Sequence, residues 1–437
     1  MVPELCGDTK STPDSVIMNV FEELSWRGLV HDRSDPEALS KLKRGDGFYI
    51  GFDPTAPSFQ VGNLVALLVS IHLTKAGLKP ILLFGGATGM IGDPGGKSAE
   101  RNLLPLEQVA ENVKLQQTQA ATLWRRAGLD ITPEIVNNLD WTRDVSVLEF
   151  LRDVGKHFTI NYMLAKDSVK SRLSGDGISY TEFSYMLLQS FDYLHLYQNK
   201  NCKLQIGGSD QWGNMTAGLE LIRRKIQGEA YALSFPLITN SEGRKFGKSE
   251  GNAVWLNPKM TSPYKFHQFW LNVQDSEVIR LLKIFTLETK ETIEEVEDLM
   301  KTDPESRHAQ KLLADSICTF VHGEQATADA KRCAQALFSG ALSDLSDEQI
   351  LEIFDDAPST AITRSQVVDL DILTLLSTTI SKSKGEARRL VQAGGMYLDS
   401  ERVSNEGLKL TETKILSKGF IVLRSGKKNY HIVRLAD

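Results

Sequence analysis

The chain has 437 residues, of which 41% are hydrophobic and 24% charged, a composition typical of a soluble globular protein with two or three domains. Its net charge of −6 argues against a wholly basic nucleic-acid binder but allows a local basic surface. The cysteines lie far apart and form no CxxC pair, which argues against a zinc knuckle and a disulfide framework; they are Cys6, Cys202, Cys318 and Cys333.

The N-terminal segment fits neither a secretory signal nor an organellar transit peptide. Its first fifteen residues are polar, lack an apolar core and contain no arginine. Elsewhere no run approaches the roughly 20 apolar residues that are needed to span a bilayer. We therefore expect a cytoplasmic protein that does not enter a membrane and whose first ~15 residues are disordered.

Residues 47–240 alternate short apolar runs with longer amphipathic ones, which indicates an α/β fold with a parallel sheet. The first runs of strand, helix and strand type are 48–52, 64–75 and 80–84. Glycine pairs close two of the strands, at Gly85-Gly86 and Gly207-Gly208. Because ligands bind at the carboxyl ends of the strands in open α/β sheets, we expect a site at these positions.

A helical region follows from Ser262 to about Phe354, and a linker is predicted around Pro358. Beyond it, two helices and several short strands indicate a small α+β module. From Ser381 to Asp437 this module has twelve Lys and Arg against six Asp and Glu, so it carries a local basic surface. The predicted segments are 1–240 (sheet domain), 241–356 (basic loop and helical domain), 357–368 (linker) and 369–437 (C-terminal module).

The first candidate binding element lies where a strand ends and a helix begins. Residues 50–56 form the end of the strand, and the helix begins with residues Gln60 to Asn63. A helix N-terminus presents unpaired N–H groups and a positive dipole end, which suit a nucleotide phosphate. Gly62 would let a nucleotide approach the backbone closely. Taken alone, such a turn is structural more often than it is a binding site.

The second candidate is the basic loop 243–251, with the sequence Gly-Arg-Lys-Phe-Gly-Lys-Ser-Glu-Gly. Mobile lysines at Lys245 and Lys248 can follow the charge that develops on a transferring pyrophosphate. A solvated surface turn is the alternative, and the loop alone does not decide between the two.

The third candidate is a helix that begins after Ser179. Ser179 and Glu182 have the spacing of a capping box. Tyr185, Gln189 and Asp192 then recur at i, i+4 and i+7, which places them on one face of the helix. Because this helix is otherwise rich in apolar residues, three polar residues on one face indicate the wall of a polar pocket. A solvated helix face is the alternative.

Together these elements resemble the paired nucleotide motifs of class I aminoacyl-tRNA synthetases, and the surrounding sequence resembles the bacterial-type tyrosyl-tRNA synthetases more closely still. The resemblance extends over essentially the whole chain from about Val20. The matching stretches are 51–56, 85–94, 181–185, 205–214 and 245–249. The resemblance implies a Rossmann-like, doubly wound catalytic domain in 1–240, a helical anticodon-side domain and an S4-type RNA-binding module in 369–437.

The resemblance also implies a reaction in two steps. The enzyme would activate L-tyrosine with ATP and then transfer the tyrosyl group to the 3′ end of tRNA(Tyr). Mg²⁺ would arrive with ATP, because no clustered carboxylates offer a dedicated metal site. The implied partners are tRNA(Tyr) and a second copy of the chain in a homodimer, and they include neither DNA nor a membrane.

Residue roles follow from the resemblance position by position. The tyrosine-binding residues would be Tyr49 and Asp192 at the phenolic hydroxyl, Asp93, Tyr185 and Gln189 at the ammonium group, and Gln211 near the carboxylate. ATP would be bound by Asp53, Gly62, Asn63, Gly208, Asp210, Lys245 and Lys248. The catalytic group would comprise Thr55, Gln60, Asn63, Lys97, Lys245, Lys248 and Ser249. RNA contacts are implied for Arg101, Lys382, Lys384, Arg388 and Arg389.

One position departs from the family pattern, which usually begins the helix motif with histidine where this chain has Gln60. Glutamine can donate a hydrogen bond to a phosphate oxygen but cannot carry positive charge. A catalytically impaired RNA-binding paralogue therefore remains an alternative. A tryptophanyl-tRNA synthetase, which shares the fold, is another, although Tyr49, Asp192 and the C-terminal module favour tyrosine.

Overall fold

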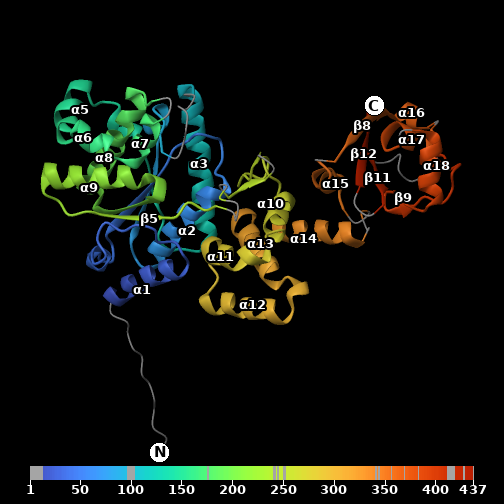
Figure 1. Cartoon of the computed structure of the whole chain (residues 1–437), viewed down its shortest axis with the longest axis horizontal. Helices are drawn as coiled ribbons and strands as arrows, with labels where there is room; N and C mark the ends of the chain where they lie inside the picture. The colour runs from blue at the N-terminus through green and yellow to red at the C-terminus, as the bar shows by residue number, and fades with distance from the viewer. Residues whose placement is uncertain are drawn as a thin grey trace, which may run out of the picture. The chain divides into compact units, whose positions relative to one another are not determined.

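The structure is a computed structural model that describes most of the chain (Figure 1). The described residues are 13–95, 104–174, 177–239, 243, 246–249, 252–339, 342, 345–355, 357–368, 370–381, 383–410, 419–426 and 429–436. The expected N-terminal disorder concerns residues that lie, up to residue 12, outside these ranges, and helix α1 (Pro13–Trp26) begins directly after them. Two compact units are present: Met1–Thr261 with Phe269–Gly323, and Ser262–Gln268 with Glu324–Asp437. The boundaries predicted from the sequence for the sheet domain, the helical domain and the C-terminal module remain a prediction.

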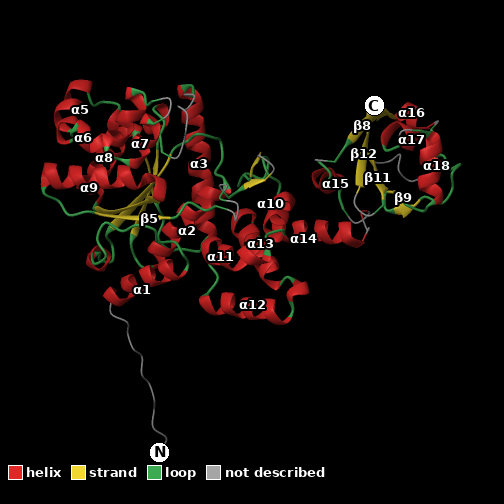
Figure 2. Cartoon of the chain, viewed as in Figure 1, coloured by secondary structure: helices red, strands yellow, loops and turns green. Residues whose placement is uncertain are grey.

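A sheet of five parallel strands forms the centre of the first unit (Figure 2). Its strands are β1 (Gly47–Phe52), β2 (Lys79–Phe84), β3 (Glu134–Asn137), β4 (Cys202–Gly208) and β5 (Tyr231–Phe235). Their order is β3-β2-β1-β4-β5, and every neighbouring pair is parallel. The direction of winding reverses between β1 and β4, where an open sheet leaves a crevice at its carboxyl edge. The expected α/β, doubly wound fold is confirmed.

Helices of two sizes pack around this sheet. The long ones are α2 (Val61–Lys75), α3 (Leu106–Arg126), α8 (Tyr180–Lys200) and α9 (Trp212–Ile226). The short ones are α4 (Leu139–Thr142), α5 (Val147–Asp153), α6 (Ile160–Leu164) and α7 (Asp167–Leu173). Single turns are η1 (Ala38–Lys41), η2 (Thr88–Met90), η3 (Gly155–His157), η4 (Ser209–Gln211) and η5 (Pro304–Ser306).

Side chains alternate between the two faces of the sheet along β1, and this decides which of them face α8. Tyr49 packs in one core cluster with Tyr193 and Leu194 of α8, whereas Phe52 packs on the opposite side against Phe84, with ring centroids 5.8 Å apart. Because successive strand residues point to opposite faces, Gly51 and then Asp53 follow Tyr49 on the α8 side. The residue pattern of β1 therefore sends polar groups toward α8 and apolar ones toward α2.

The chain continues with a small antiparallel hairpin and then helices. The hairpin consists of β6 (Lys248–Ser249) and β7 (Asn252–Ala253). The helices are α10 (Pro263–Leu271), α11 (Asp275–Phe285), α12 (Lys290–Thr302), α13 (His308–His322), α14 (Glu324–Ser339) and α15 (Asp347–Ile353). The helical region expected from Ser262 to Phe354 is thereby confirmed.

The second unit contains a sheet with the order β10-β9-β11-β12-β8. Its strands are β8 (Ser359–Thr363), β9 (Met396–Leu398), β10 (Glu401–Arg402), β11 (Phe420–Ser425) and β12 (Asn429–Ala436), and its helices after α15 are α16 (Arg364–Val368), α17 (Ile372–Thr379) and α18 (Lys384–Gln392). Ile421 and Leu423 face a core with α17 and α18, whereas Phe420 and Val422 face a second core that includes Phe354. Both faces of β11 are thus covered.

The segment 357–368 is not the linker that its composition suggested. It contains β8, which pairs in parallel with β12 through partners such as Thr360 and Val433, and then α16. The β-branched residues of Ser359–Thr363 suit a strand. Pro358 precedes the strand at the edge of the sheet, where the missing N–H breaks no ladder. Proline and Ser/Thr are common to linkers and edge strands, so composition did not separate the two.

Candidate functional site

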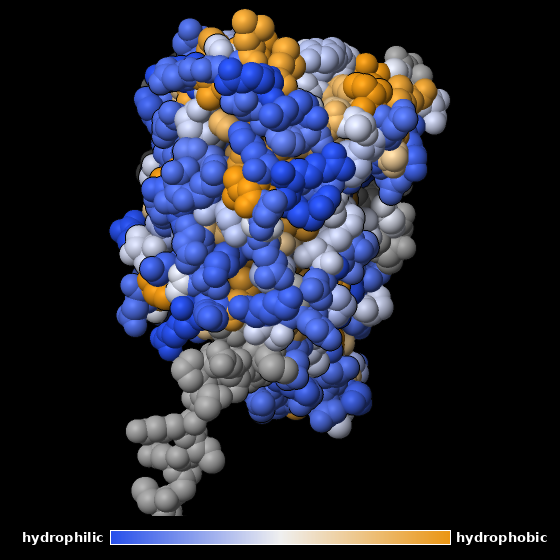
Figure 3. All heavy atoms as spheres, turned by 90° about the vertical axis from the view of Figure 1, so that its left-hand side faces the viewer, coloured by the Kyte–Doolittle hydropathy of each residue, from blue (hydrophilic) through white to orange (hydrophobic). Residues whose placement is uncertain are grey.

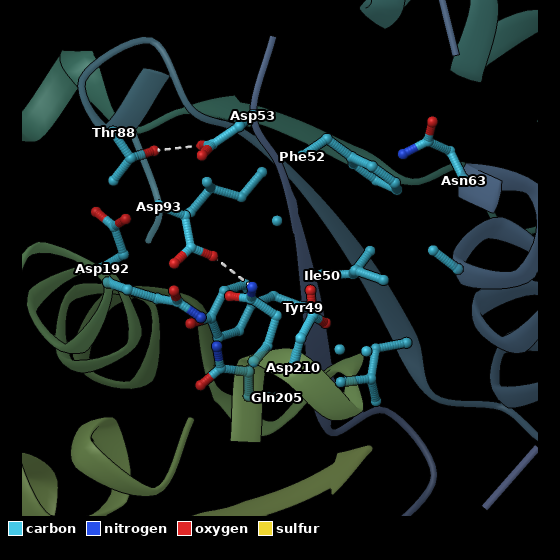
Figure 4. A pocket seen from close by; sticks show the side chains of 18 of the residues that line it. Tyr49, Ile50, Phe52, Asp53, Asn63, Thr88, Asp93, Asp192, Gln205 and Asp210 are labelled. Carbon is cyan, nitrogen blue, oxygen red and sulfur yellow. Dashed lines mark hydrogen bonds between the residues drawn. The ribbon is translucent and has the colours of Figure 1, made fainter. Parts of the chain in front are cut away.

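A pocket of about 290 Å³ lies at the carboxyl ends of β1 and β4 (Figure 4). Twelve of the residues singled out in the sequence line it: Tyr49, Asp53, Thr55, Gly62, Asn63, Asp93, Tyr185, Gln189, Asp192, Gly208, Asp210 and Gln211. The remaining lining includes Thr88 and Gln205, which sequence reasoning did not single out. The pocket therefore combines the strand end, the start of α2 and the polar face of α8.

One end of the pocket is closed by Asp192, which is 3% exposed. Its two carboxylate oxygens accept hydrogen bonds from Asn138 Nδ2 at 2.9 Å and from Trp141 Nε1 at 2.8 Å. Burial raises the pKa of this carboxyl to about 7, against the effect of the two donors, and the Asp53 carboxylate raises it further. Asp192 is thus held in place yet titrates near neutrality.

Tyr49 stands beside this carboxylate with its hydroxyl fully buried. Within the part of the chain that the structure describes, the Tyr49 hydroxyl has no hydrogen-bond partner. Burial raises the pKa of Tyr49 well above its ordinary value, and the nearby Asp192 charge contributes. The buried amide oxygens of Gln189 and Gln205, which also line the pocket, likewise have no partner among the described residues. Unpaired buried polar atoms are rare, and three on one pocket indicate a polar ligand.

A second carboxylate, Asp93, lies opposite and is 5% exposed. It accepts hydrogen bonds from Gln211 Nε2 and, at 2.9 Å, from the backbone N–H of Gly95. Gln211 in turn accepts from Asn214 Nδ2 at 3.3 Å. The side chains of Asp93 and Gln211 therefore form one bonded pair on the wall of the pocket.

Asp53 accepts hydrogen bonds from two hydroxyl groups of the pocket lining. Its oxygens accept from Thr88 Oγ1 at 2.9 Å and from the Tyr185 hydroxyl at 2.8 Å, the former drawn as a dashed line in Figure 4. Asn138 Nδ2 lies 3.1 Å from the same Thr88 hydroxyl. A hydroxyl that donates one bond keeps lone pairs to accept others, so Tyr185 can still receive a ligand N–H. Asp53 is thereby tied into the end of the pocket that Tyr185 lines.

The start of α8 is capped by Ser179, the residue that the sequence predicted. Ser179 accepts the backbone N–H of Glu182 and so caps the helix. The Glu182 carboxylate pairs with Arg172 at 2.9 Å, and both side chains are buried. This buried pair fixes the beginning of the helix that carries Tyr185, Gln189 and Asp192. All three line the pocket, as their common helix face predicted.

The two nucleotide-type elements meet at the start of α2. Val61 N–H donates to Val254 O at 3.0 Å, and Val254 N–H donates to Gly247 O at 2.8 Å. Gly247 has φ +87°, and a Cβ there would lie 3.1 Å from Val61 Cβ, so glycine suits this position twice over. The tertiary structure thus brings the backbone of the basic loop against the first turn of α2.

Gln60 lies outside the pocket lining among the described residues. Gln60 is the N-cap of α2, and its N–H donates to Asn63 Oδ1 at 2.9 Å. Lys248 and Ser249 form β6. The residues Lys97, Arg101, Lys245 and Lys382 lie outside the described ranges.

Sequence reasoning missed the residues that hold Asp192 and Asp53. Asn138 and Trp141 follow β3, and Thr88 follows β2, so all three stand just beyond strand ends. That position was the available signal, because ligand-binding residues gather at the carboxyl edge of a parallel sheet.

In the C-terminal unit, the basic side chains of α18 lie near acidic side chains or a backbone carbonyl. Arg388 Nε donates to Glu406 at 3.0 Å, and Lys384 Nζ lies 3.9 Å from Asp371. Arg389 is exposed and reaches the Gly385 carbonyl at 3.4 Å. Exposed pairs of this kind are weak, so these cations can exchange partners.

The described residues offer neither a metal site nor a membrane-spanning helix. They contain no group of three or more His, Cys, Asp or Glu placed to hold a metal ion. None of the helices they form is both long and apolar enough for a membrane span.

Known proteins resemble this chain over most of its length. Residues 43–339 match the family model of "tRNA synthetases class I (W and Y)", and residues 349–433 match the "Tyrosine--tRNA ligase SYY-like C-terminal domain". The tyrosine–tRNA ligases of Geobacillus kaustophilus and Roseiflexus castenholzii are 47% and 46% identical, over 96% and 95% of this chain and 100% and 99% of theirs. The crystal structure of a C-terminally truncated mitochondrial tyrosyl-tRNA synthetase from Aspergillus nidulans is similar with a TM-score of 0.67 and 30% identity, covering 74% of this chain and 98% of that one.

Proposed function

This chain belongs to the tyrosine–tRNA ligases, class I aminoacyl-tRNA synthetases that activate tyrosine with ATP and charge tRNA with it, and we propose that the pocket at the ends of β1 and β4 performs the activation step. The observation that carries the assignment is the unpaired, buried Tyr49 hydroxyl beside the buried Asp192 carboxylate. A phenolic hydroxyl can donate to the carboxylate and accept from Tyr49 at once. Phenylalanine would leave the Tyr49 hydroxyl unpaired and would give the Asp192 carboxylate no donor beyond Asn138 and Trp141.

The opposite wall suits the amino-acid end of tyrosine. Asp93 supplies negative charge for the ammonium group, the Tyr185 hydroxyl has lone pairs to accept an N–H, and the Gln189 amide oxygen is a third acceptor. Gln211, which donates to Asp93, places an amide near the substrate carboxylate. Tyrosine would thus lie with its phenol toward α4 and its reactive carboxylate toward the start of α2.

ATP would occupy the part of the pocket lined by Asp53, Thr55, Gly62, Asn63, Gly208 and Asp210. Gly62 lies in the first turn of α2, where backbone N–H groups and the helix dipole favour phosphate. Asp210 has the chemistry to accept from ribose hydroxyls. The lysines of the basic loop, Lys245 and Lys248, would supply positive charge to the pyrophosphate.

The chemistry needs positioning and charge stabilisation, without a protein nucleophile. The tyrosine carboxylate attacks the α-phosphate of Mg-ATP, forming tyrosyl-adenylate and releasing pyrophosphate, and the terminal ribose of tRNA(Tyr) then takes the tyrosyl group. Thr55 and the loop lysines would stabilise the charge on the phosphates in the first step. Magnesium belongs to this scheme as part of the nucleotide substrate.

Tyrosine-dependent exchange of pyrophosphate into ATP tests the activation step. We expect exchange with tyrosine and far less with tryptophan or phenylalanine. Tyr49→Phe should narrow the preference for tyrosine over phenylalanine, because the pocket then lacks one of its two phenol partners. Tyr193→Phe is the matched control, since the Tyr193 hydroxyl bonds the carbonyls of Lys203 and Tyr231 and does not line the pocket. Exchange with tryptophan equal to that with tyrosine would sink the assignment.

We further infer a homodimer formed through the α5–α6 patch, a group of exposed apolar side chains. They are Val147 (74% exposed), Leu148 (80%), Leu151 (45%), Ile160 (60%) and Leu164 (37%). Figure 3 shows hydrophobic side chains gathered at the top of the face that carries α5 in Figure 1. Apolar patches of this kind mark protein interfaces.

The patch can be tested by sedimentation. The unsubstituted chain should sediment at twice its mass of 48.6 kDa, and Leu148→Glu should shift it toward the single-chain mass. Leu106→Glu is the control, because Leu106 is 61% exposed on α3 and lies outside the patch. A dimer that survives Leu148→Glu unchanged would contradict this interface.

The C-terminal unit is proposed to bind tRNA(Tyr) through the basic residues of α18, notably Lys384, Arg388 and Arg389. Phosphate contacts weaken with salt, so replacing Arg389 with Ala should raise the KM for tRNA and reduce its salt dependence while leaving pyrophosphate exchange unchanged. Such an enzyme would work in the cytoplasm, a reducing compartment that suits its three described cysteines, which are all buried and form no disulfide with one another.

A further inference from the structure

Helix α3 carries three amide side chains that point at the backbone of one loop. Asn112, Gln116 and Gln119 recur at i, i+4 and i+7, and all three bond the segment Pro54–Phe59 between β1 and α2. We call these three residues the α3 amide ladder. No motif in the sequence singled them out, and none of them lines the pocket.

The ladder pairs backbone groups that the loop does not pair by itself. Asn112 Nδ2 donates to Pro54 O, and Gln116 Nε2 donates to Ala56 O, both at 2.9 Å. Gln119 Oε1 accepts the Phe59 N–H at 2.8 Å and the Ser58 hydroxyl at 3.2 Å. The partner groups fix the amide orientations, because a carbonyl must face an N–H and an N–H must face an oxygen.

These bonds are buried and braced. Asn112 and Gln116 are 1% and 3% exposed, and Gln108 Nε2 donates to Asn112 Oδ1 at 3.0 Å. On another side of the loop, a Cβ added to Gly89 would lie 2.8 Å from Pro54 Cδ. Leu256 N–H donates to Phe59 O at 2.9 Å. The loop is therefore held from several sides, with α3 supplying a bond at each end and one in the middle.

The role of the α3 amide ladder follows from the position of the loop that it holds. The loop starts after Asp53, which bonds Tyr185 and Thr88 in the pocket, and it ends at Gln60, the N-cap of α2. Thr55 lies within it and lines the pocket. We propose that the α3 amide ladder is a positioning device for the nucleotide end of the site: it sets where Thr55 and the first turn of α2 stand relative to the tyrosine end. This proposal rests on the proposed assignment of ATP to Thr55 and the start of α2.

A positioning role predicts a selective kinetic effect. Loosening the loop should lower kcat and raise the KM for ATP. A displaced Thr55 would interact less well with the phosphates of ATP, both in the bound substrate and in the transition state. The KM for tyrosine should stay the same, because Asp192 is held by Asn138 and Trp141, for which the described residues show no hydrogen bond to the loop. A merely structural role would lower thermal stability and the number of active sites without this split.

Replacing glutamine with glutamate at two positions of the α3 amide ladder gives the sharpest test. Gln119 accepts hydrogen bonds from the loop, whereas Gln116 donates one to it. Gln119→Glu keeps the oxygen acceptor that Phe59 and Ser58 need, so kcat/KM for ATP should stay within about twofold of the unsubstituted enzyme. Gln116→Glu replaces the donor to Ala56 O with a carboxylate oxygen, so kcat/KM for ATP should fall about thirtyfold. Each value is measured by pyrophosphate exchange in the full-length enzyme, normalised to active sites titrated by adenylate formation.

Two further variants cover the case in which Gln116→Glu does not fold. Gln116→Met removes the donor without adding charge and should reduce kcat/KM for ATP about tenfold. Gln117→Met, one position along the helix and with no hydrogen bond to the loop among the described residues, should leave it unchanged. Equal losses in Gln119→Glu and Gln116→Glu, or a KM for tyrosine that rises with the KM for ATP, would overturn the proposal.

Thr55→Ala separates this proposal from the assignment it rests on. If Thr55→Ala slows adenylate formation while Gln116→Met does not, the ladder proposal fails and the nucleotide assignment stands. If neither variant alters kcat or the KM for ATP, both fall together. Losses in both variants, with the KM for tyrosine unchanged, support the ladder.

Discussion

The two ends of the pocket differ in the groups that line them and in how deeply these groups are buried. The tyrosine end consists of buried side chains: Tyr49, Asp93, Tyr185 and Asp192 are each 6% exposed or less. At the nucleotide end, Thr55 and Gly62 are exposed, and the start of α2 offers backbone groups. Buried, paired groups discriminate between amino acids because a wrong ligand leaves them unsatisfied. An open end can admit a large charged nucleotide and follow its changing charge.

The buried end carries an energetic cost that the open end does not. Burial removes the Asp192 carboxylate from water and so disfavours its ionised form, which is why its pKa is raised to about 7. Asn138 and Trp141 offset part of that cost with two hydrogen bonds. The specificity of the tyrosine end is therefore coupled to stability and to pH, and both couplings can be measured.

The largest expected effect comes from Asp192→Asn. The variant should lose about a thousandfold in kcat/KM for tyrosine, because an amide cannot accept the phenol hydrogen while keeping both donors from Asn138 and Trp141. Pyrophosphate exchange measures the loss. The KM for ATP, obtained at saturating tyrosine, should change little, and an equal loss on the ATP side would erase the distinction between the two ends.

The same variant should also change how the stability of the chain depends on pH. With a folded pKa of about 7 against an ordinary value of 3.8, Asp192 binds more protons in the folded state between these values, so its contribution to stability is present at low pH and is lost as pH rises to 7. The free energy of unfolding of Asp192→Asn relative to the unsubstituted chain should therefore rise by about 2–3 kcal/mol from pH 5 to pH 8. A difference that is constant with pH in urea unfolding would contradict the raised pKa.

The next effect in size tests the open end. Thr55→Ala should lower kcat for adenylate formation about a hundredfold, because a group that stabilises the phosphates is removed, while the KM for tyrosine stays unchanged. Thr118→Ala is a matched control, since Thr118 is exposed on α3 and its hydroxyl bonds only the Lys114 carbonyl among described groups. A weaker affinity for tyrosine in Thr55→Ala would show that the ends are not separable.

A third effect is the pH dependence of tyrosine binding. The ionised Asp192 carboxylate accepts the phenol hydrogen bond, so binding should weaken as pH falls below about 7. Between pH 8 and pH 6 the KM for tyrosine should rise about tenfold, and the KM for ATP less, when pyrophosphate exchange is followed across this range. A KM for tyrosine that is flat between these values would show that Asp192 is not the group that binds the phenol.

The smallest effect is expected at Gln60. Its side chain is outside the pocket lining, and its extended backbone, with φ −101° and ψ 167°, is open to other residues. Gln60→His should therefore hold the rate of adenylate formation or raise it by about threefold, through added positive charge near the phosphates. Rapid-quench measurement of adenylate formation gives the rate; a hundredfold loss would show that Gln60 has a role of its own.

Much of the site could be predicted because helical and strand periodicities are local. Ser179 and the spacing of Tyr185, Gln189 and Asp192 placed three pocket residues on one helix face, and all three line the pocket. Tyr49 was named from the family resemblance alone, and it too lines the pocket. The expected linker 357–368 failed for the converse reason: β8 exists because β12 offers it a partner, and its own composition did not announce that.

The sequence by itself determined the family, the α/β class and the residue types at the site, since these depend on order and spacing along the chain. Only the tertiary structure decided which groups meet. Asn138 and Trp141 bond Asp192 from 54 and 51 residues away, Gly247 packs against Val61, and α3 holds the loop before α2. Periodicity tells which way a side chain points on its own element, but its partner is set by how distant elements pack, and the polarity of each hydrogen bond follows from that packing.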